Sequence, residues 1–367
     1  MIGAFLKELE GGGSIPFEKF MEAALYHPEF GYYTKRIRTV GRTGDFSTWP
    51  GLHSSLAAAI ANWLRACPAR HIIEAGAGTG QLAASVLKHL GFFHRIRTTL
   101  HIVEISPVLR KAQERLLNGK NVVWHSGMED ALSAAGGHAN IYSNELPDAF
   151  PCRVFVRSDS RWKELALKIA DGSAREVLLD SPLPESSSFE GDPPDGSRVE
   201  VHESYRRWLG TWSALWKRGR MLTIDYGSVM PGLYHRRPAG TLRAYAHHQR
   251  LTGPDVYASF GHRDITADVN FTDLENWGSA LGWNIINRSC LTGFIRSQCP
   301  RAPLDSQMTE AGEAFQVLDT GPGQNGAGVE EASRLLFFSK SRQPGRLPHI
   351  QNPLNLVEFY HSAHTWG

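Results

Sequence analysis

The 367-residue chain has few cysteines, almost no net charge and no long hydrophobic run near its N-terminus. Its cysteines, Cys67, Cys152, Cys290 and Cys299, lie far apart and form no C-x-x-C pair, which argues against a zinc or redox motif. The 39 Lys and Arg against 37 Asp and Glu leave a net charge of +2. This balance argues against nucleic acid or an anionic membrane as the main partner.

Targeting and metal-binding patterns are missing as well. Residues 1–10 lack the basic-then-apolar layout of a secretory signal and contain two acids, unlike a transit peptide. The apolar run at 56–61 is about a third of the length that a membrane span needs. The 16 histidines show no H-E-x-x-H spacing, so we predict no metal site. We expect a cytoplasmic protein without membrane insertion.

The residues that are present have the composition of a globular protein, with 41% hydrophobic and 21% charged residues. From residue 72 onward, β-type runs alternate with helical patterns, which predicts an α/β fold: a mostly parallel sheet with helices on both faces. The predicted strands are residues 71–75, 99–104, 121–124, 140–144 and 221–225. The predicted helices are residues 17–26, 52–64, 81–90 and 107–117, the last with Ser106 as its N-cap.

Three segments fall outside this alternation. Residues 1–65 are predicted to form an N-terminal helical lid in front of a main domain at 66–340. Residues 150–200 interrupt the main domain with a predicted β-meander and a loop rich in Ser, Pro and Gly. Residues 341–367 are polar, contain three prolines and predict a docking or disordered tail.

The most informative stretch is IIEAGAGTGQL at 72–82, where an apolar strand runs into three alternating glycines and then a helix. Gly76, Gly78 and Gly80 let the backbone turn sharply and approach a ligand without a Cβ in the way. The helix that follows points free N–H groups at the ligand. Because open α/β sheets bind ligands at this carboxyl end of their strands, the stretch predicts a cofactor site.

The glycine spacing leaves two cofactors open. The dinucleotide fingerprint G-x-G-x-x-G/A fails when it is counted from Gly76, because Gln81 takes its last position. Counted from Gly78, it passes in part with Ala83. The order G-x-G-x-G with Glu74 before it is more typical of S-adenosylmethionine-dependent methyltransferases, since a carboxylate suits a ligand with an ammonium and a sulfonium. A nicotinamide dehydrogenase stays as the alternative.

Polar residues after the next strands complete the predicted cofactor site. Glu104 ends the second strand, where a carboxylate accepts hydrogen bonds from ribose hydroxyls, although a solvated strand-end carboxylate is the alternative. After the third strand, Met128 is predicted to cover an adenine face and Glu129 to meet its exocyclic amine. Asn144 and Glu145 end the fourth strand and are predicted to face the transferred methyl group.

A series of short blocks is collinear between residues 15 and 295. The blocks are FEKFM at 17–21, ALYHP at 24–28, GYY at 31–33, GRTGDFST at 41–48, VEISP at 103–107, NE at 144–145, DYG at 225–227, GTLR at 240–243 and DITADV at 264–269. Together they resemble the MidA-like methyltransferases, a family that includes a mitochondrial complex I assembly factor with arginine methyltransferase activity. The resemblance implies S-adenosylmethionine as cofactor, a Rossmann-like class I methyltransferase sheet, and an insertion between strands four and five that shapes the acceptor site.

The resemblance also implies a protein side chain as the acceptor, with arginine as the candidate. A guanidinium stays protonated in water, so a carboxylate must hold it and localise its charge to free one nitrogen as the nucleophile. Glu145 is the predicted clamp and Asp148 the second carboxylate, for which a helix-start cap is the alternative. Gly44 and Asp45 are predicted to hold the methionine end of the cofactor, with an ordinary turn as the alternative.

Two departures from the family pattern lie near the predicted substrate entrance. Residues 49–52, WPGL, stand where relatives carry Ser-Pro and an acid, and Leu146 and Pro147 stand where relatives carry an aromatic pair. These departures bear on the substrate more than on the cofactor. They leave open an alternative function, a cofactor-binding assembly factor that docks a partner protein without turnover.

Aromatic residues in the second half of the chain could line a binding site or pack in the core. Tyr226, at the end of the fifth predicted strand, is a candidate for the acceptor channel, with core packing as the alternative. Trp208, Trp212 and Trp216 recur every four residues, which predicts a buried helix stripe rather than a base-stacking platform.

Overall fold

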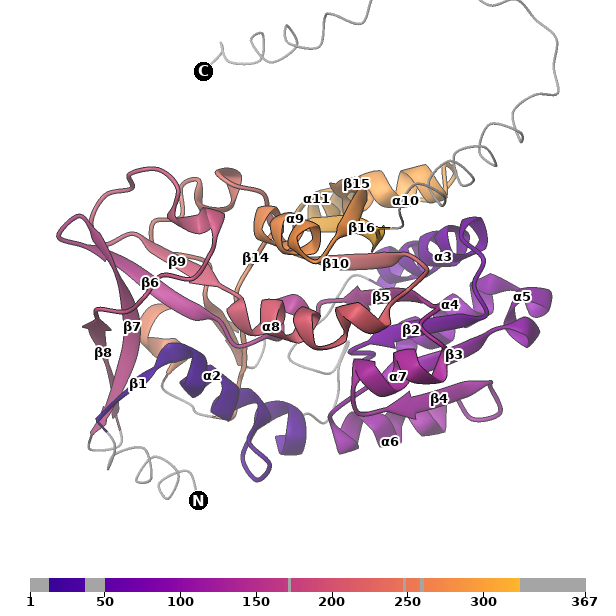
Figure 1. The fold of residues 1–367 in the computed structure, drawn as a ribbon, viewed down its shortest axis with the longest axis horizontal. Helices are drawn as coiled ribbons and strands as arrows, with labels where there is room; N and C mark the ends of the chain where they lie inside the picture. The colour runs from indigo at the N-terminus through magenta and orange to yellow at the C-terminus, as the bar shows by residue number, and fades with distance from the viewer. Residues whose placement is uncertain (1–12, 37–49, 171–172, 247–248, 258–260, 324–367) are drawn as a thin grey trace, which may run out of the picture. The chain divides into compact units, whose positions relative to one another are not determined.

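The computed structural model describes residues 13–323, except 37–49, 171–172, 247–248 and 258–260 (Figure 1). The predicted contacts of Gly44 and Asp45 and the predicted tail at 341–367 therefore lie outside the described residues. The elements below come from the described part of the chain.

A mixed central sheet is built from the apolar runs of the sequence (Figure 1). Its strands are β2 (His71–Ala75), β3 (Thr99–Val103), β4 (Val122–His125), β5 (Asn140–Asn144), β10 (Met221–Ser228), β14 (Val269–Asn270), β15 (Trp283–Cys290) and β16 (Phe315–Pro322). They follow the order β15-β16-β10-β5-β2-β3-β4, and β14 pairs with β10. Strands β10, β5, β2, β3 and β4 run parallel, whereas β16 is antiparallel to β10 and β15. The carboxyl ends of the parallel strands therefore meet at one edge.

Helices cover both faces of this sheet. One face packs against α3 (Pro50–Ala66), α4 (Gln81–Leu90) and α10 (Leu291–Gln298), and the other against α7 (Met128–Ala134), α8 (Glu203–Trp212) and α9 (Phe271–Ala280). Because side chains alternate along a strand, Ile72 joins the first cluster and Ile73 the second. Further helices are α5 (Phe92–Arg97), α6 (Pro107–Leu116) and α11 (Ser306–Glu313). As predicted, the Ser106 side chain caps α6 by accepting from the Leu109 N–H at 3.3 Å.

The chain forms a second sheet, four of whose strands lie between β5 and β10 in the sequence and one of which, β1 (Ser14–Pro16), comes from the N-terminal region. It contains β1, β6 (Arg153–Ser158), β7 (Arg161–Ala170), β8 (Ser173–Leu179) and β9 (Arg198–Val201), all paired antiparallel. A small sheet follows from β11 (Arg243–Ala246), β12 (Gln249–Leu251) and β13 (Asp264–Thr266). Helix α2 (Phe17–Tyr26) shares a buried cluster with both sheets through Phe17, Phe20 and Met21.

Single turns and bends connect these elements. The short ones are η1 (Tyr32–Arg36), a π-helix, and the 3₁₀ turns η2 (Pro147–Ala149), η3 (Ser187–Phe189), η4 (Ser213–Leu215), η5 (Gly232–Tyr234) and η6 (Gly253–Val256). Among the helices that the structure describes, none has the length and apolar character needed to cross a bilayer.

The predicted tryptophan stripe is largely a core feature. Trp212 is fully buried and Trp216, just beyond η4, is 3% exposed, and both pack in the cluster under α7 and α8. Trp208 is only partly buried and packs against that cluster from the side that faces a cavity. The stripe therefore anchors α8 on the sheet and leaves one ring beside the cavity.

Three histidines form a ladder across neighbouring strands of the central sheet. His71 Nδ1 lies 2.9 Å from His101 Nε2, and His101 Nδ1 lies 2.9 Å from His125 Nε2. Burial lowers the pKa of His101 to about 4, and the other two histidine pKa values are also lowered by burial. The ladder is therefore held in its neutral form near pH 7.

Candidate functional site

A cavity of about 530 Å³ opens where the parallel strands β2, β3 and β5 end. Its wall includes the glycine loop after β2, the residues that follow β3 and β5, and the 3₁₀ turn η2. Helix α2, the adjoining η1, α8 and β13 close it from the other side. This is the edge at which open α/β sheets bind ligands.

The glycine loop shapes the floor of the cavity. Gly76 and Gly78 line it, with φ angles of 70° and 54° in the left-handed region. A Cβ on Gly76 would lie 2.8 Å from Leu146 Cδ1, whereas a Cβ on Gly78 would meet nothing within 4 Å. Gly80 does not line the cavity; it starts α4 and packs against Gln113. The loop therefore leaves open space above Gly78 into which a ligand fits.

Glu74 lies just before this loop and lines the cavity while it is only 2% exposed. The Tyr142 hydroxyl donates to its Oε2 at 2.7 Å. Burial raises the pKa of Glu74 to about 8, although the Tyr142 hydrogen bond opposes the shift. A cationic group that enters the cavity favours the charged carboxylate, so Glu74 is suited to a positively charged ligand.

Glu104 follows β3 and is held from two sides. Its Oε1 accepts from the Ser106 N–H at 2.8 Å, and its Oε2 accepts from Gln113 Nε2 at 3.0 Å. Burial raises the pKa of Glu104 to about 7. Gln113 also donates to the Gly78 carbonyl at 2.7 Å, so this one side chain of α6 links the glycine loop to the carboxylate.

Asn144 and Glu145 follow each other at the end of β5 and both line the cavity. Asn144 Nδ2 donates to Glu145 Oε1 at 3.1 Å. Glu145 has a φ of 53°, which for a non-glycine residue costs about 1–3 kcal/mol and marks a position that the surroundings enforce. Burial raises its pKa to about 7, helped by the charge of Asp264 and opposed by the Asn144 hydrogen bond and by Arg243.

Asp148 lines the cavity from within η2 and is 3% exposed. The N-cap of η2 is Leu146, so the structure does not give Asp148 the alternative role of a helix-start cap. Its backbone N–H donates to Asp225 Oδ2 at 3.1 Å. Burial raises the pKa of both aspartates, helped by the charge of Asp148 at Asp225 and by Glu145 and Asp264 at Asp148, where Arg243 opposes the shift. Asp225 is fully buried behind the cavity wall.

Three residues that line the cavity, Tyr26, Tyr33 and Asp264, were not predicted as site residues from the sequence. The Tyr33 hydroxyl donates to Asp264 Oδ1 at 2.7 Å, and the rings of Tyr26 and Tyr33 stack with their centroids 5.6 Å apart. The Tyr26 hydroxyl donates to the Ala149 carbonyl at 2.8 Å. All three stand in blocks that carry the family resemblance, but no spacing rule pairs residues so far apart in the chain.

The mouth of the cavity carries charges of both signs. Arg207 and Trp208 of α8 line it opposite Glu18, Lys19 and Glu22 of α2. Arg207 forms an ion pair with Glu18, and Lys19 pairs with Glu22 at 2.7 Å. The Lys19–Glu22 pair is exposed on both sides and contributes little to stability, whereas in the other pair Arg207 is exposed and the Glu18 side chain is only 13% exposed.

Other predicted site residues are not brought to the cavity. Met128 is fully buried in the cluster under α7, and neither it nor Glu129, in the first turn of that helix, lines the cavity. Met128 therefore packs in the core instead of covering a ligand face. The ring of Tyr226 packs against that of Phe315 in a tilted arrangement, with centroids 3.9 Å apart, and Tyr226 also lies outside the lining of the cavity.

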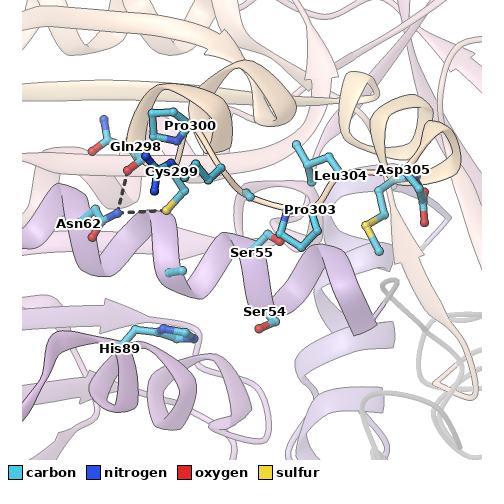
Figure 2. A pocket seen from close by; sticks show the side chains of 14 residues that line it. Ser54, Ser55, Asn62, His89, Gln298, Cys299, Pro300, Pro303, Leu304 and Asp305 are labelled. Atoms are coloured by element: carbon cyan, nitrogen blue, oxygen red, sulfur yellow. Dashed lines mark hydrogen bonds between the residues drawn. The ribbon is translucent and has the colours of Figure 1, made fainter.

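A second cleft, of about 930 Å³, lies beside α3 (Figure 2). Asn62 Nδ2 donates there to the Gln298 carbonyl at 2.7 Å and contacts Cys299 Sγ at 3.0 Å. None of the residues of the glycine loop lines this cleft. Over the described part of the chain, no group of three His, Cys, Asp or Glu is placed to hold a metal ion.

The residues of the first cavity fit an adenosyl ligand with a cationic end. Space above Gly78 accommodates a ligand close to the backbone. Glu104 is oriented by two donors and retains acceptor capacity for ribose hydroxyls. Glu74 supplies a buried carboxyl for positive charge.

Comparison with known proteins agrees with this fit. The sequence pattern of a family described as S-adenosyl-L-methionine-dependent methyltransferases matches residues 55–288. Mitochondrial proteins named protein arginine methyltransferase NDUFAF7 are similar. The Drosophila melanogaster homolog is 29% identical over 298 residues, which is 71% of this chain and 65% of the relative. The Danio rerio protein is 26% identical over 299 residues, which is 71% of this chain and 68% of the relative. This chain thus spans about two thirds of the length of these relatives.

Two solved structures from Burkholderia thailandensis resemble the fold. One, bound to S-adenosylhomocysteine, is 27% identical with a TM-score of 0.71, over 89% of this chain and 93% of that chain. A native crystal structure from the same organism has the same identity and coverage and a TM-score of 0.70.

Proposed function

The chain belongs to the S-adenosyl-L-methionine-dependent methyltransferases, and we propose that it methylates a protein side chain, with an arginine guanidinium as acceptor. The observation that carries the proposal is a group of three carboxyls in the cavity, Glu145, Asp148 and Asp264. The names of the curated relatives support the acceptor class.

S-adenosylmethionine supplies a methyl group on a positively charged sulfur. In our proposal the backbone of Gly76 and Gly78 lies against the cofactor, Glu104 accepts from its ribose hydroxyls, and Glu74 faces its positive charge. Asn144 orients Glu145 beside it. A contribution of Gly44 and Asp45 stays a prediction.

The three carboxyls suit a guanidinium better than a neutral acceptor. Each has a neighbour of the same sign, and Arg243 is engaged with Asp268 and the Thr241 carbonyl. An incoming guanidinium is always protonated and relieves the repulsion through charge-assisted hydrogen bonds. Glu145 holds the guanidinium in a fork and localises its charge, which leaves one nitrogen as the nucleophile. Because its pKa is about 7, Glu145 is also suited to take the proton that this nitrogen loses.

The residues that follow β5 are proposed to shape the acceptor entrance. The second sheet leads into α8, which places Arg207 and Trp208 at the mouth. The rings of Tyr26, Tyr33 and Trp208 line the acceptor side and exclude water, which strengthens the interaction between the carboxyls and the guanidinium.

Methyl transfer to matched peptides tests the proposal. The purified protein is incubated with labelled S-adenosylmethionine and peptides that differ only in carrying arginine or lysine. We expect label on arginine, and Glu145→Gln to lower the rate by about 100-fold or more while S-adenosylhomocysteine binding persists. Glu310→Gln, exposed on α11 and outside the cavity, is the control and should behave as the unmodified protein.

Two outcomes would contradict this proposal. Transfer to lysine in preference to arginine, or full activity of Glu145→Gln, removes the guanidinium clamp. Binding of S-adenosylhomocysteine without transfer to any peptide or protein favours the alternative, an assembly factor that docks a partner without turnover. NAD, titrated in parallel, should not bind.

A further inference from the structure

Helix α5 exposes an unusual amount of apolar surface. None of its six residues is buried, and Phe92, Phe93 and Ile96 are 61%, 71% and 57% exposed. At about 100° per residue, these three side chains fall within an arc of roughly 100° on the helix. The rest of the circumference carries His94, Arg95 and Arg97. A contiguous exposed apolar face with a polar rim marks an interaction surface.

The surroundings of this face are basic. Residues 75–103 contain no Asp or Glu, but they include Lys88, Arg95 and Arg97. Two exposed bases from neighbouring strand starts lie close to α5 along the backbone. The Arg70 carbonyl accepts from the Thr99 N–H at 2.8 Å, and Lys120 precedes Asn121, whose side chain donates to the Thr98 carbonyl at 3.1 Å.

We call this surface the basic edge. It consists of the apolar face (Phe92, Phe93 and Ile96) together with Lys88, Arg95 and Arg97. The basic edge is separate from the cavity. It directly precedes β3, at the amino ends of the parallel strands, whereas the cavity lies at their carboxyl ends. In Figure 1, α5 lies at the far right and α2, which closes the cavity, at the lower left. A partner on the basic edge therefore leaves the cavity accessible.

We propose that the basic edge docks the protein on an anionic membrane surface. Aromatic and aliphatic side chains enter the boundary between headgroups and acyl chains, while Lys and Arg meet the lipid phosphates. The charge of the edge is complementary to such lipids, and a bilayer accommodates projecting rings without a matching pocket. Since no described helix spans a bilayer and α5 has only six residues, the contact is peripheral, weak and sensitive to salt.

Vesicle flotation of the full chain tests this docking. We expect binding to phosphatidylcholine vesicles that contain phosphatidylglycerol, none to phosphatidylcholine alone, and release at about 0.5 M salt. R95Q/R97Q should weaken binding by about 25-fold, because each basic residue contributes about fivefold. F92S/F93S/I96S should weaken it by about tenfold through the lost apolar contact.

A matched control separates docking from general surface effects. I285S/I286S removes side chains that are 39% and 46% exposed on β15, away from α5, and should leave vesicle binding unchanged. All variants should retain S-adenosylhomocysteine binding, which shows that they fold. Absence of binding to anionic vesicles, equal binding to neutral vesicles, or binding that the α5 variants do not change would overturn the proposal. A second result would overturn the proposal as well. In it, the protein does not bind vesicles but associates with itself or captures another protein, and only the α5 variants abolish that association.

Discussion

The two ends of the parallel strands differ in both charge and burial. At the carboxyl ends, acidic side chains are gathered around a cavity, where Glu74, Glu104, Asp148 and Asp264 are buried and Glu145 is half-buried. At the amino ends, the basic edge stands in solvent with its apolar face uncovered. The net charge of +2 is the sum of an acidic region at one end of the strands and a basic region at the other, together with the rest of the chain. Near-neutral composition therefore says little about local partners.

Burial makes the two ends respond differently to substitution. Desolvation raises the pKa of Glu74, Glu104, Glu145 and Asp148, and like charges nearby add to these shifts for Glu74, Glu145 and Asp148, so changing one group alters the protonation of its neighbours. Exposed charges interact through water and have small effects on stability. We therefore expect effects of substitutions to decrease from the cavity to the basic edge.

The largest effect should come from filling the glycine loop. In Gly76→Val, the new side chain meets Leu146 and occupies a left-handed backbone position, so S-adenosylhomocysteine should bind about 100-fold more weakly by calorimetry. Gly136→Val is the control, since Gly136 has a φ of 61° but open space around its Cβ. An equal loss of affinity in both variants would show that general backbone strain, and not the cavity floor, is responsible.

Removing the charge of Asp264 should have the next largest effect. Asp264→Asn should lower methyl transfer by about tenfold through weaker binding of the proposed guanidinium acceptor. It should also lower the pKa of Glu145, because the Asp264 charge raises it. The limb of the pH–rate profile that requires a charged Glu145 then moves to lower pH. Tyr33→Phe keeps the charge and should leave that limb in place; a limb that does not move in Asp264→Asn contradicts the coupling.

The histidine ladder lies between the two ends and should produce an intermediate effect. Folding lowers the pKa of His101 from 6.5 to about 4, so the unfolded chain binds more protons between these values. Stability should therefore fall as the pH decreases from 6.5 to 4. The urea midpoint of His101→Gln should depend less on pH across that window. His89→Gln, at an exposed site, should keep the original slope, and an unchanged slope in His101→Gln would contradict the role of the ladder.

The smallest effect on stability and catalysis is expected at the basic edge. F92S/F93S/I96S should change the free energy of unfolding by no more than about 0.5 kcal/mol, because these side chains are already exposed in the folded state. Peptide methylation in solution should be unchanged. Phe155→Ser, in the buried second sheet, should cost about 3–5 kcal/mol in the same unfolding experiment. A comparable loss in the α5 variant would mean that α5 packs against the core.

Local features of the chain predict the class I-like α/β fold well. Strands at 71–75 and 140–144 and the helix at 81–90 have the predicted bounds, because apolar runs, glycines and helix starts are encoded by neighbouring residues. The Ser106 cap and the cofactor follow from the same local signals. Glu104, Glu145 and Asp148 reach the cavity because strand ends converge on one edge of a parallel sheet.

The sequence by itself therefore determined the parallel strands β2, β3, β4 and β5, the start of β10, the glycine loop and the cofactor class, but not the antiparallel strands β15 and β16. Only the tertiary structure decided which distant side chains share the cavity, since Tyr33 and its partner Asp264 are separated by 231 residues. Only the tertiary structure shows that Met128 is buried in the core and that the apolar face of α5 is exposed. The physical reason is that burial depends on packing between remote segments, and burial sets both the pKa of a carboxyl and the exposure of a ring.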